Sequence, residues 1–240
     1  MEALSSLKLS HILFLDIETV PLQPSYEELS PVERSLWEDK TRYIRQEVPA
    51  EDYYERAGIW AEFGKIVCIS VGYFVVKNGQ RQFRVRSFVG EERDILEDFS
   101  YLVNQFFSGR EHLLAAHNGK EFDFPFIARR MLILGLALPE KLQLFGKKPW
   151  ELGFLDTLDL WKFGDYKHYT SLTLLAHTLG IPSPKDDING SQVRDVFYEE
   201  NDIHRIATYC EKDTITVAQI LLRLRYEPLL TDDEILIIPR

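Results

Sequence analysis

Cysteine is scarce in this chain, and long apolar runs are missing. The 240 residues contain two cysteines, Cys68 and Cys210, each within an apolar stretch. Two such thiols indicate no disulfide framework and agree with a reducing compartment, so we expect a cytoplasmic protein. No apolar run approaches the ~18 residues of a membrane span. The first ten residues also lack the shape of a signal peptide, so no membrane association is expected.

Basic residues are few for a protein that would bind nucleic acid. The chain has 28 lysines and arginines against 38 acidic residues, which gives a formal net charge of −10. This balance argues against a broad basic surface. It does not exclude a nuclease, because bound divalent cations add positive charge where a phosphate lies. With 45% hydrophobic residues, we expect one domain over residues 1–240.

The periodicity of apolar residues predicts an α/β fold. Strands are expected over 11–19, 65–76, 81–89, 113–117 and 154–156, and helices over 91–107, 126–136, 171–179 and 203–224. Residues 183–200 read as a polar loop. This order predicts a mixed five-stranded sheet flanked by helices, with a helical insertion at about 25–62 after the first strand.

The insertion is rich in aromatic residues and begins with a helix-start signal. Ser30-Pro31-Val32-Glu33 combines an N-cap serine, a proline in the first turn and a capping-box glutamate. The aromatic residues fit two roles, a small satellite core or a flap that stacks on bases. The satellite core is the favoured interpretation.

Four acidic residues lie at positions that suggest a catalytic or metal-binding site. Asp16 and Glu18 lie two residues apart at the end of the first strand, so both carboxylates point to one side. Asp123 follows a short strand and is surrounded by aromatic residues, although ordinary helix-start chemistry explains it equally well. Asp213 lies on the apolar stripe of the last long helix, where a carboxylate needs a partner or a cation. Tyr209 precedes it by one turn on the same face, as a site residue or as core.

Other polar residues are interpreted as structural or solvent-exposed groups. Asp156 reads as a cap or a supporting group, and His117 and His168 as structural histidines rather than bases or ligands. Lys185 and Arg194 are candidates for phosphate contact, with solvated loop charges as the favoured alternative. No histidine or cysteine pair has the spacing of a structural zinc site.

Three segments together resemble the tyrosine-bearing branch of the DEDD exonuclease superfamily, and in particular the proofreading exonuclease domain of family B DNA polymerases. They are residues 14–19 (FLDIET), 117–123 (HNGKEFD) and 209–213 (YCEKD), which occur in the family's order. The resemblance covers roughly residues 11–225 and implies a ribonuclease H-like fold. No polymerase domain follows, so a stand-alone exonuclease is expected.

The resemblance also implies roles for individual residues. Asp16 matches the carboxylate shared by two metal ions, Glu18 and Asp213 match ligands of the ion that carries the attacking water, and Asp123 matches a ligand of the second ion. Tyr209 matches the group that orients this water. The positions that lie near the terminal nucleotide in such enzymes are Thr19, Asn118 and Phe122. Mg²⁺ or Mn²⁺ is the expected cofactor, because hard cations take carboxylate ligands.

The expected activity is 3'→5' hydrolysis of nucleic acid, with single-stranded DNA favoured over RNA. An exoribonuclease or oligonucleotidase with the same site stays open, because discrimination depends on contacts to the 2'-hydroxyl. A small-molecule hydrolase using the same ions is a further alternative, which the acidic surface favours. A non-catalytic nucleic-acid-binding relative would be expected to lack at least one of the five site residues.

Overall fold

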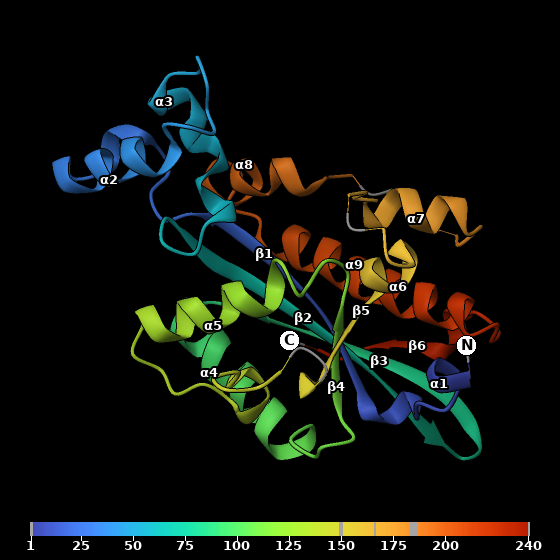
Figure 1. Ribbon diagram of the computed structural model, residues 1–240. Coiled ribbons are helices and arrows are strands. Elements are labelled where there is room, and N and C mark those ends of the chain that lie inside the picture. The colour runs from blue at the N-terminus through green and yellow to red at the C-terminus, as the bar shows by residue number, and fades with distance from the viewer. Residues whose placement is uncertain (1, 149–150, 166, 183–186, 240) are drawn as a thin grey trace.

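The strands form one mixed sheet around the first strand. The structure, a computed structural model, describes residues 2–148, 151–165, 167–182 and 187–239. Within these residues the sheet has six strands in the order β5-β4-β1-β2-β3-β6 (Figure 1). Their bounds are β1 Ile12–Pro21, β2 Gly64–Lys77, β3 Gln80–Val89, β4 Leu113–Ala116, β5 Phe154–Asp156 and β6 Ile235–Ile237. β2 runs antiparallel to both neighbours, and the other adjacent pairs are parallel.

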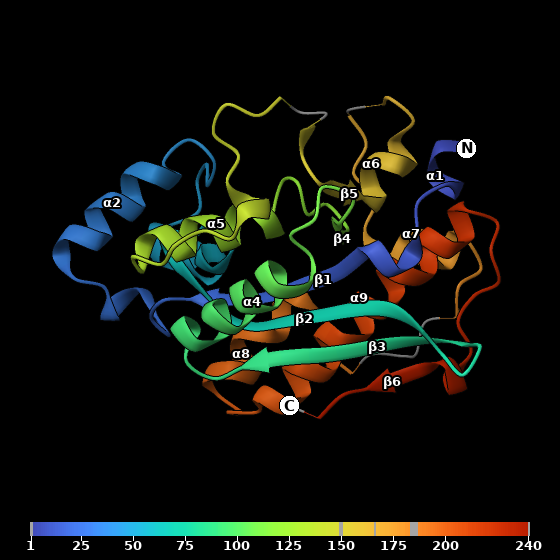
Figure 2. The same cartoon turned by 90° about the horizontal axis from the view of Figure 1, so that it is seen from below.

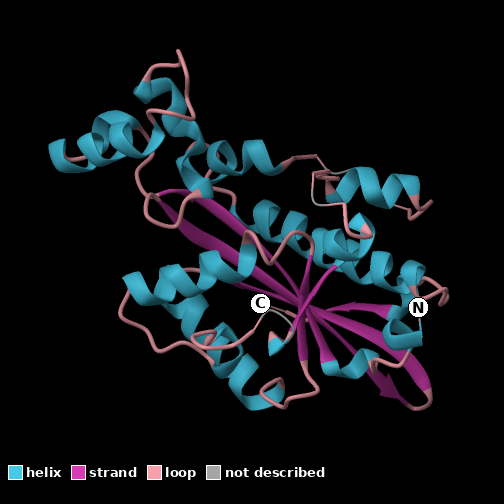
Figure 3. Ribbon diagram, in the orientation of Figure 1, coloured by secondary structure: helices cyan, strands magenta, loops and turns pink. Residues whose placement is uncertain are grey.

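Helices cover both faces of this sheet. The α-helices are α1 Glu2–Ser5, α2 Pro31–Thr41, α3 Ala50–Tyr53, α4 Glu92–Phe106, α5 Asp123–Ile133, α6 Thr157–Lys162, α7 Leu172–Thr178, α8 Val193–Tyr198 and α9 Ile203–Leu224. Short 3₁₀ turns are η1 Leu9–His11, η2 Tyr26–Glu28, η3 Tyr54–Ile59, η4 Glu140–Leu142, η6 Gly190–Gln192 and η7 Asp232–Glu234. Figures 2 and 3 show α4 on one side of the sheet and α9 on the other.

The alternation of side chains along β1 decides which helix each residue meets. Leu13, Leu15 and Ile17 join the buried cluster that contains side chains of α4 and α5. Ile12 and Phe14 point the other way and pack with side chains of α9. Successive side chains of a strand alternate between faces, so Asp16 and Glu18 follow Phe14 onto the α9 side. The predicted central strand, apolar on both faces, is confirmed.

The expected fold class is confirmed, with one more strand than the five expected. β6 has three residues and pairs in parallel with β3, Phe83 opposite Ile235. So short a strand carries little periodicity, and its partner lies far away in the sequence. The predicted polar loop at 183–200 is wrong in part, because η6 and α8 occupy its second half. Helix α6 was not expected either.

The insertion folds as the satellite core. Its buried residues are Leu29, Trp37, Ala50, Tyr54, Ala57 and Phe63, with Tyr26, Tyr53 and Trp60 packed against them. The capping box of Ser30 and Glu33 is present at the start of α2. The Trp37 indole donates to the Ala50 carbonyl (2.8 Å), which joins α2 to α3. These aromatic rings are used mainly to bury apolar area, so the stacking flap is not supported.

Among the described residues, none of the helices combines the length and the apolar composition that crossing a membrane requires.

Candidate active site

Asp16 and Glu18 lie on β1 where the strand passes beneath α9. Glu18 is 7% exposed, and Asp16 is half-buried. The pairing of β1 with β2 shifts register between Glu18 and Thr19, an irregularity that re-aims neighbouring side chains. Burial raises the pKa of both carboxyls well above their ordinary values, and repulsion from Asp213 raises each further. The predicted same-side pair is therefore in place.

Asp123 reaches the same region from the first residue of α5. Its carboxyl is 4% exposed. The backbone amide of Ile17 on β1 donates a hydrogen bond to it, which places Asp123 against the first strand. Burial is the main reason that its pKa rises to about 7. Phe122 is the N-cap residue of α5 and Asp123 lies in its first turn, so helix-start chemistry and a role in the acid cluster both agree with this position.

Asp156 holds the loop that presents Asp123. Its carboxylate accepts hydrogen bonds from the backbone amides of Asn118 (2.9 Å), Lys120 (3.0 Å) and Leu158 (2.9 Å). In the same loop, a side chain at Gly119 would meet the Ala116 Cβ at 2.4 Å, so the loop needs glycine there. Asp156 was expected to be a cap or a supporting group, and its role as the N-cap of α6 is confirmed.

Tyr209 and Asp213 come from α9. Both are half-buried, and the Tyr209 hydroxyl hydrogen-bonds the Asp213 carboxylate. The pKa of Tyr209 is raised, first by burial and then by the negative charges of Asp213, Glu18 and Asp16. The phenol therefore stays protonated at neutral pH and acts as a hydrogen-bond donor.

The four acids form one electrostatic cluster, although each lies far from most of the others in sequence. Repulsion from Glu18, Asp213 and Asp123 raises the pKa of Asp16 in addition to burial. Neighbouring carboxylates in a buried site cannot all ionise unless a cation compensates them. Oxygen donors are the ligands that Mg²⁺ and Mn²⁺ prefer. The donor set therefore fits hard divalent cations.

Two residues beside the cluster were missed by sequence reasoning. The Cys210 thiol lies 3.3 Å from the Asp16 Oδ2 atom, and a ligand atom from each of Asp16, Glu18 and Cys210 lies within 4.8 Å of the others. Tyr169 is 68% exposed. Partial burial raises the pKa of its hydroxyl, and the negative charge of Asp123 raises that pKa further. The position of Cys210 on the apolar stripe of α9, three residues before Asp213, could have indicated from the sequence that it lies near the acids. No pattern in the sequence places Tyr169 near them.

The three expected nucleotide contacts lie around the acids and keep some exposure. Thr19 directly follows Glu18, and its hydroxyl donates to the Gly58 carbonyl (2.8 Å) at the end of the insertion. Asn118 has a left-handed backbone (φ 61°) in the loop after β4. Phe122 packs against Phe126, with ring centroids 5.5 Å apart. Their contact with substrate stays a prediction.

The histidines behave as structural residues. The two His117 ring nitrogens lie 2.9 Å from the Thr157 hydroxyl and 2.8 Å from the Thr170 carbonyl. Since a carbonyl only accepts, Nε2 donates and Nδ1 accepts. His168 is exposed and lies 3.4 Å from Asp165. Neither histidine is free to serve as a buried base at the acid cluster.

Of the two candidate phosphate contacts, Arg194 bonds to groups of the protein itself. Arg194 donates to the Asp195 carboxylate and to the Pro24 carbonyl, both at 2.6 Å. It therefore ties α8 to the start of the insertion. Lys185 lies outside the described residues.

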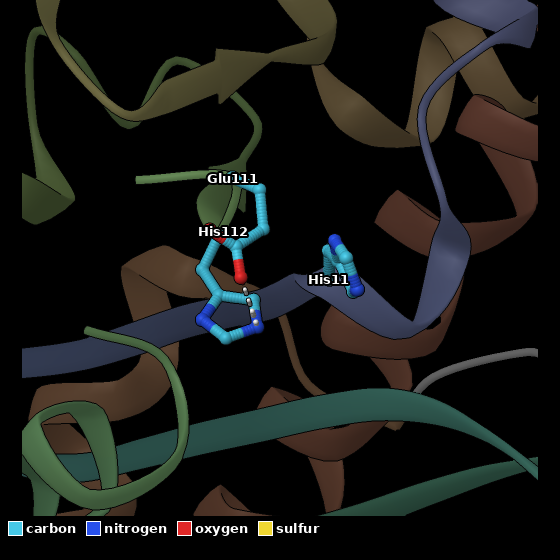
Figure 4. Close-up of side chains that lie close together, drawn as sticks. All are labelled: His11, Glu111 and His112. Atoms are coloured by element: carbon cyan, nitrogen blue, oxygen red, sulfur yellow. Dashed lines mark ion pairs between the residues drawn. The ribbon is translucent and has the colours of Figure 1, made fainter. Parts of the chain in front are cut away.

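A second cluster of ligand-type side chains lies before β1 and β4, at their other end. His11 and Glu111 flank His112, and the Glu111 Oε1 atom is 4.0 Å from the His112 Nε2 atom (Figure 4). The Gly109 amide donates to His112 Nδ1 (3.2 Å), so the neutral ring carries its proton on Nε2. The Lys141 ammonium donates to the His112 carbonyl (2.6 Å). A protonated Nε2 and a neighbouring ammonium both disfavour a metal ion here.

Comparison with known proteins identifies related sequences and folds. Residues 59–232 match the model of a family described as "Predicted 3'-5' exonuclease related to the exonuclease domain of PolB". This range contains Asp123, Tyr209 and Asp213 and begins after the strand of Asp16 and Glu18. No curated protein matches the chain by sequence.

The comparison with solved structures gives matches at low sequence identity, and the first of them shares the fold. The family B DNA polymerase from the hyperthermophilic archaeon Pyrobaculum calidifontis matches with a TM-score of 0.51 and 18% identity over 88% of this chain. The chain spans about a quarter (24%) of that polymerase's length. The RNase domain of the yeast Pop2 protein matches with a TM-score of 0.43 and 10% identity, over 94% of this chain and 80% of that domain.

Proposed function

The chain belongs to the family of predicted 3'-5' exonucleases related to the exonuclease domain of PolB, and on that premise we propose that it hydrolyses phosphodiester bonds at the 3' end of single-stranded DNA. The observation that carries the proposal is the convergence of Asp16, Glu18, Asp123 and Asp213 from β1, α5 and α9 into one repelling cluster. Buried like charges are costly to assemble unless a ligand uses them.

Two ions of Mg²⁺ or Mn²⁺ held by these four acids would neutralise charge on the scissile phosphate and lower the pKa of the attacking water. The negative charges of Glu18, Asp213 and Asp123 all act on Asp16, and Asp16 is the residue that we assign to both ions. Glu18 and Asp213 are assigned to the ion on the α9 side, and Asp123 to the ion on the α5 side.

Tyr209 is assigned to orienting the attacking water. Its hydroxyl is protonated and hydrogen-bonded to Asp213, and the residue as a whole is half-buried. A phenol with a raised pKa is a poor base at neutral pH, so its contribution is positional. The terminal nucleotide would lie between the loop of Asn118 and Phe122 and the end of β1 at Thr19. Stacking on Phe122 suits a single strand, whose bases are free to meet an aromatic ring.

The activity is tested with 5'-labelled substrates. Single-stranded DNA, duplex DNA and RNA are each incubated with Mg²⁺, Mn²⁺ or chelator. We expect a ladder that shortens from the 3' end of single-stranded DNA, and no cleavage in chelator. Equal turnover in chelator would refute the metal requirement, and preferential cleavage of RNA would replace DNA as the substrate class.

A further inference from the structure

The thiol of Cys210 lies against the acid that the proposed mechanism uses most. The Cys210 Sγ atom lies 3.3 Å from the Asp16 Oδ2 atom and 3.3 Å from the Asp16 carbonyl oxygen, so its single S–H has both Asp16 oxygens as acceptors. Cys210 is fully buried on α9. Since α9 packs across β1 at this point, the thiol is held by the helix rather than by the strand that carries Asp16.

This contact joins the two elements that supply most of the site. Cys210 follows Tyr209 and precedes Asp213 by three residues on α9, while Asp16 and Glu18 belong to β1. A hydrogen bond from α9 to the Asp16 carboxylate therefore fixes the position of one site acid relative to another. The bond also lowers the pKa of Asp16, against the larger effect of burial.

We propose that Cys210 is a positioning residue that orients the Asp16 carboxylate for cation binding; this inference rests on the proposed function. The residue type suits the task. The contact with the thiol restrains the rotamer of the carboxylate. Because a thiol is a weak donor, most of the negative charge stays on the carboxylate oxygens and is available to a cation. Groups that orient a metal ligand from outside the ligand set typically change metal affinity or activity by ~10- to 100-fold when they are removed.

The second cysteine provides a matched control. Cys68 lies on β2, opposite Glu18, and is as fully buried as Cys210. Its sulfur hydrogen-bonds the Cys210 thiol and lies 3.8 Å from the Ser70 hydroxyl. Cys68→Ala therefore removes a thiol of the same size from the same buried cluster, while Cys210 keeps its bond to Asp16.

The experiment compares Cys210→Ala, Cys210→Ser and Cys68→Ala in three measurements. The melting temperature in chelator reports packing, Mn²⁺ affinity from the electron paramagnetic resonance of free Mn²⁺ reports the ligand set without turnover, and kcat and KM report the reaction. We expect both alanine variants to melt at similarly lower temperatures. Only Cys210→Ala should bind Mn²⁺ roughly tenfold more weakly. In the same variant kcat should fall by a larger factor than KM changes. Cys210→Ser, which keeps a donor, should recover most of both.

The outcomes separate this inference from the proposed function. Equal Mn²⁺ affinity in Cys210→Ala and Cys68→Ala, or no recovery in Cys210→Ser, overturns the positioning role even if the wild type is an active exonuclease. A wild type without nuclease activity refutes the proposed function, while Mn²⁺ affinity still decides whether Cys210 orients Asp16. Should Cys210→Ala prove too unstable to purify, Cys210→Val fills the volume without a donor and takes its place with the same expectation.

Discussion

The Tyr209 hydroxyl hydrogen-bonds the carboxylate of Asp213, one helical turn further along α9. Removing this hydroxyl leaves the ring and its packing in place, so Tyr209→Phe should keep the fold and Mn²⁺ binding. Turnover should fall by roughly ten- to a thousandfold, the scale of one positioned catalytic group. The loss should appear in kcat more than in KM.

His168→Ala and His204→Ala, the second on an exposed position of the first turn of α9, serve as controls for Tyr209→Phe, and each should reduce turnover only slightly. If Tyr209→Phe stays within about twofold of the wild type while either histidine variant is inactive, Tyr209 is only a packing residue.

Replacing any of the four acids by alanine should cut turnover by several orders of magnitude. In chelator these variants should melt at or above the wild-type temperature, because each change relieves repulsion within the cluster. Mg²⁺ should raise the melting temperature of the wild type by linkage and that of the variants less. Differential scanning calorimetry with and without Mg²⁺ checks both effects. If Asp123→Ala is active but unfolds more easily than the wild type, the role of Asp123 is purely structural.

Substrate affinity should depend only modestly on salt. Two lysines near the Asp123 loop already face acids: the Lys120 ammonium lies 2.9 Å from Asp159, and the Lys162 ammonium lies 3.8 Å from both Asp159 and Glu121. Few basic side chains are then left to displace counterions from the phosphates. The dependence of binding affinity on salt concentration scales with the number of phosphates that basic side chains neutralise. Binding of labelled single-stranded DNA at several salt concentrations, with Ca²⁺ to block cleavage, measures the slope. A steep slope would reveal a basic groove.

Tyr169 should contribute to substrate binding. It is an exposed aromatic residue within the influence of Asp123, and bases of single strands stack on such rings with ~1–3 kcal/mol each. Tyr169→Ala should therefore raise KM roughly tenfold with a small change in kcat. Tyr43→Ala, which removes another exposed ring, on the insertion, is the control. Equal KM values for the two variants would count against stacking at Tyr169.

The ion pair between Arg81 and Glu234 should make stability depend on pH in acid. Two bonds of 2.8 Å join the guanidinium on β3 to the carboxylate before β6, and they lower the pKa of Glu234 to about 2. The unfolded chain, with a pKa near 4.5, takes up this proton first as the pH falls. The stabilisation is thus complete above pH ~4.5 and is lost toward pH ~2.

Glu234→Gln should consequently lower the free energy of unfolding at pH 7 by about 1 kcal/mol, the scale of a partly exposed pair. It should also make the stability less sensitive to pH between ~2 and ~4.5. Urea titrations of both proteins across this range test the difference. Parallel stability curves for the two proteins would show that the pair contributes nothing.

Local sequence patterns determined much of this protein. The apolar alternation around Asp16 and Glu18 indicated a central strand, and the stripe on α9 predicted the helix from Ile203 to Leu224 at the bounds observed. Strand alternation and helical spacing are properties of neighbouring residues, so they can be read without the fold. The ordered motifs around Asp123 and Asp213 added the resemblance to a family.

Only the tertiary structure decided the contacts between distant segments. The thiol of Cys210 meets Asp16 because α9 crosses β1, and nothing near either residue in the sequence specifies that crossing. Tyr169 comes near Asp123 because Thr170 is held by His117, 53 residues away. The sixth strand pairs with β3, and the ion pair beside it joins Arg81 to Glu234, 153 residues away. Such contacts form between segments that chain folding brings together, and local periodicity carries no information about them.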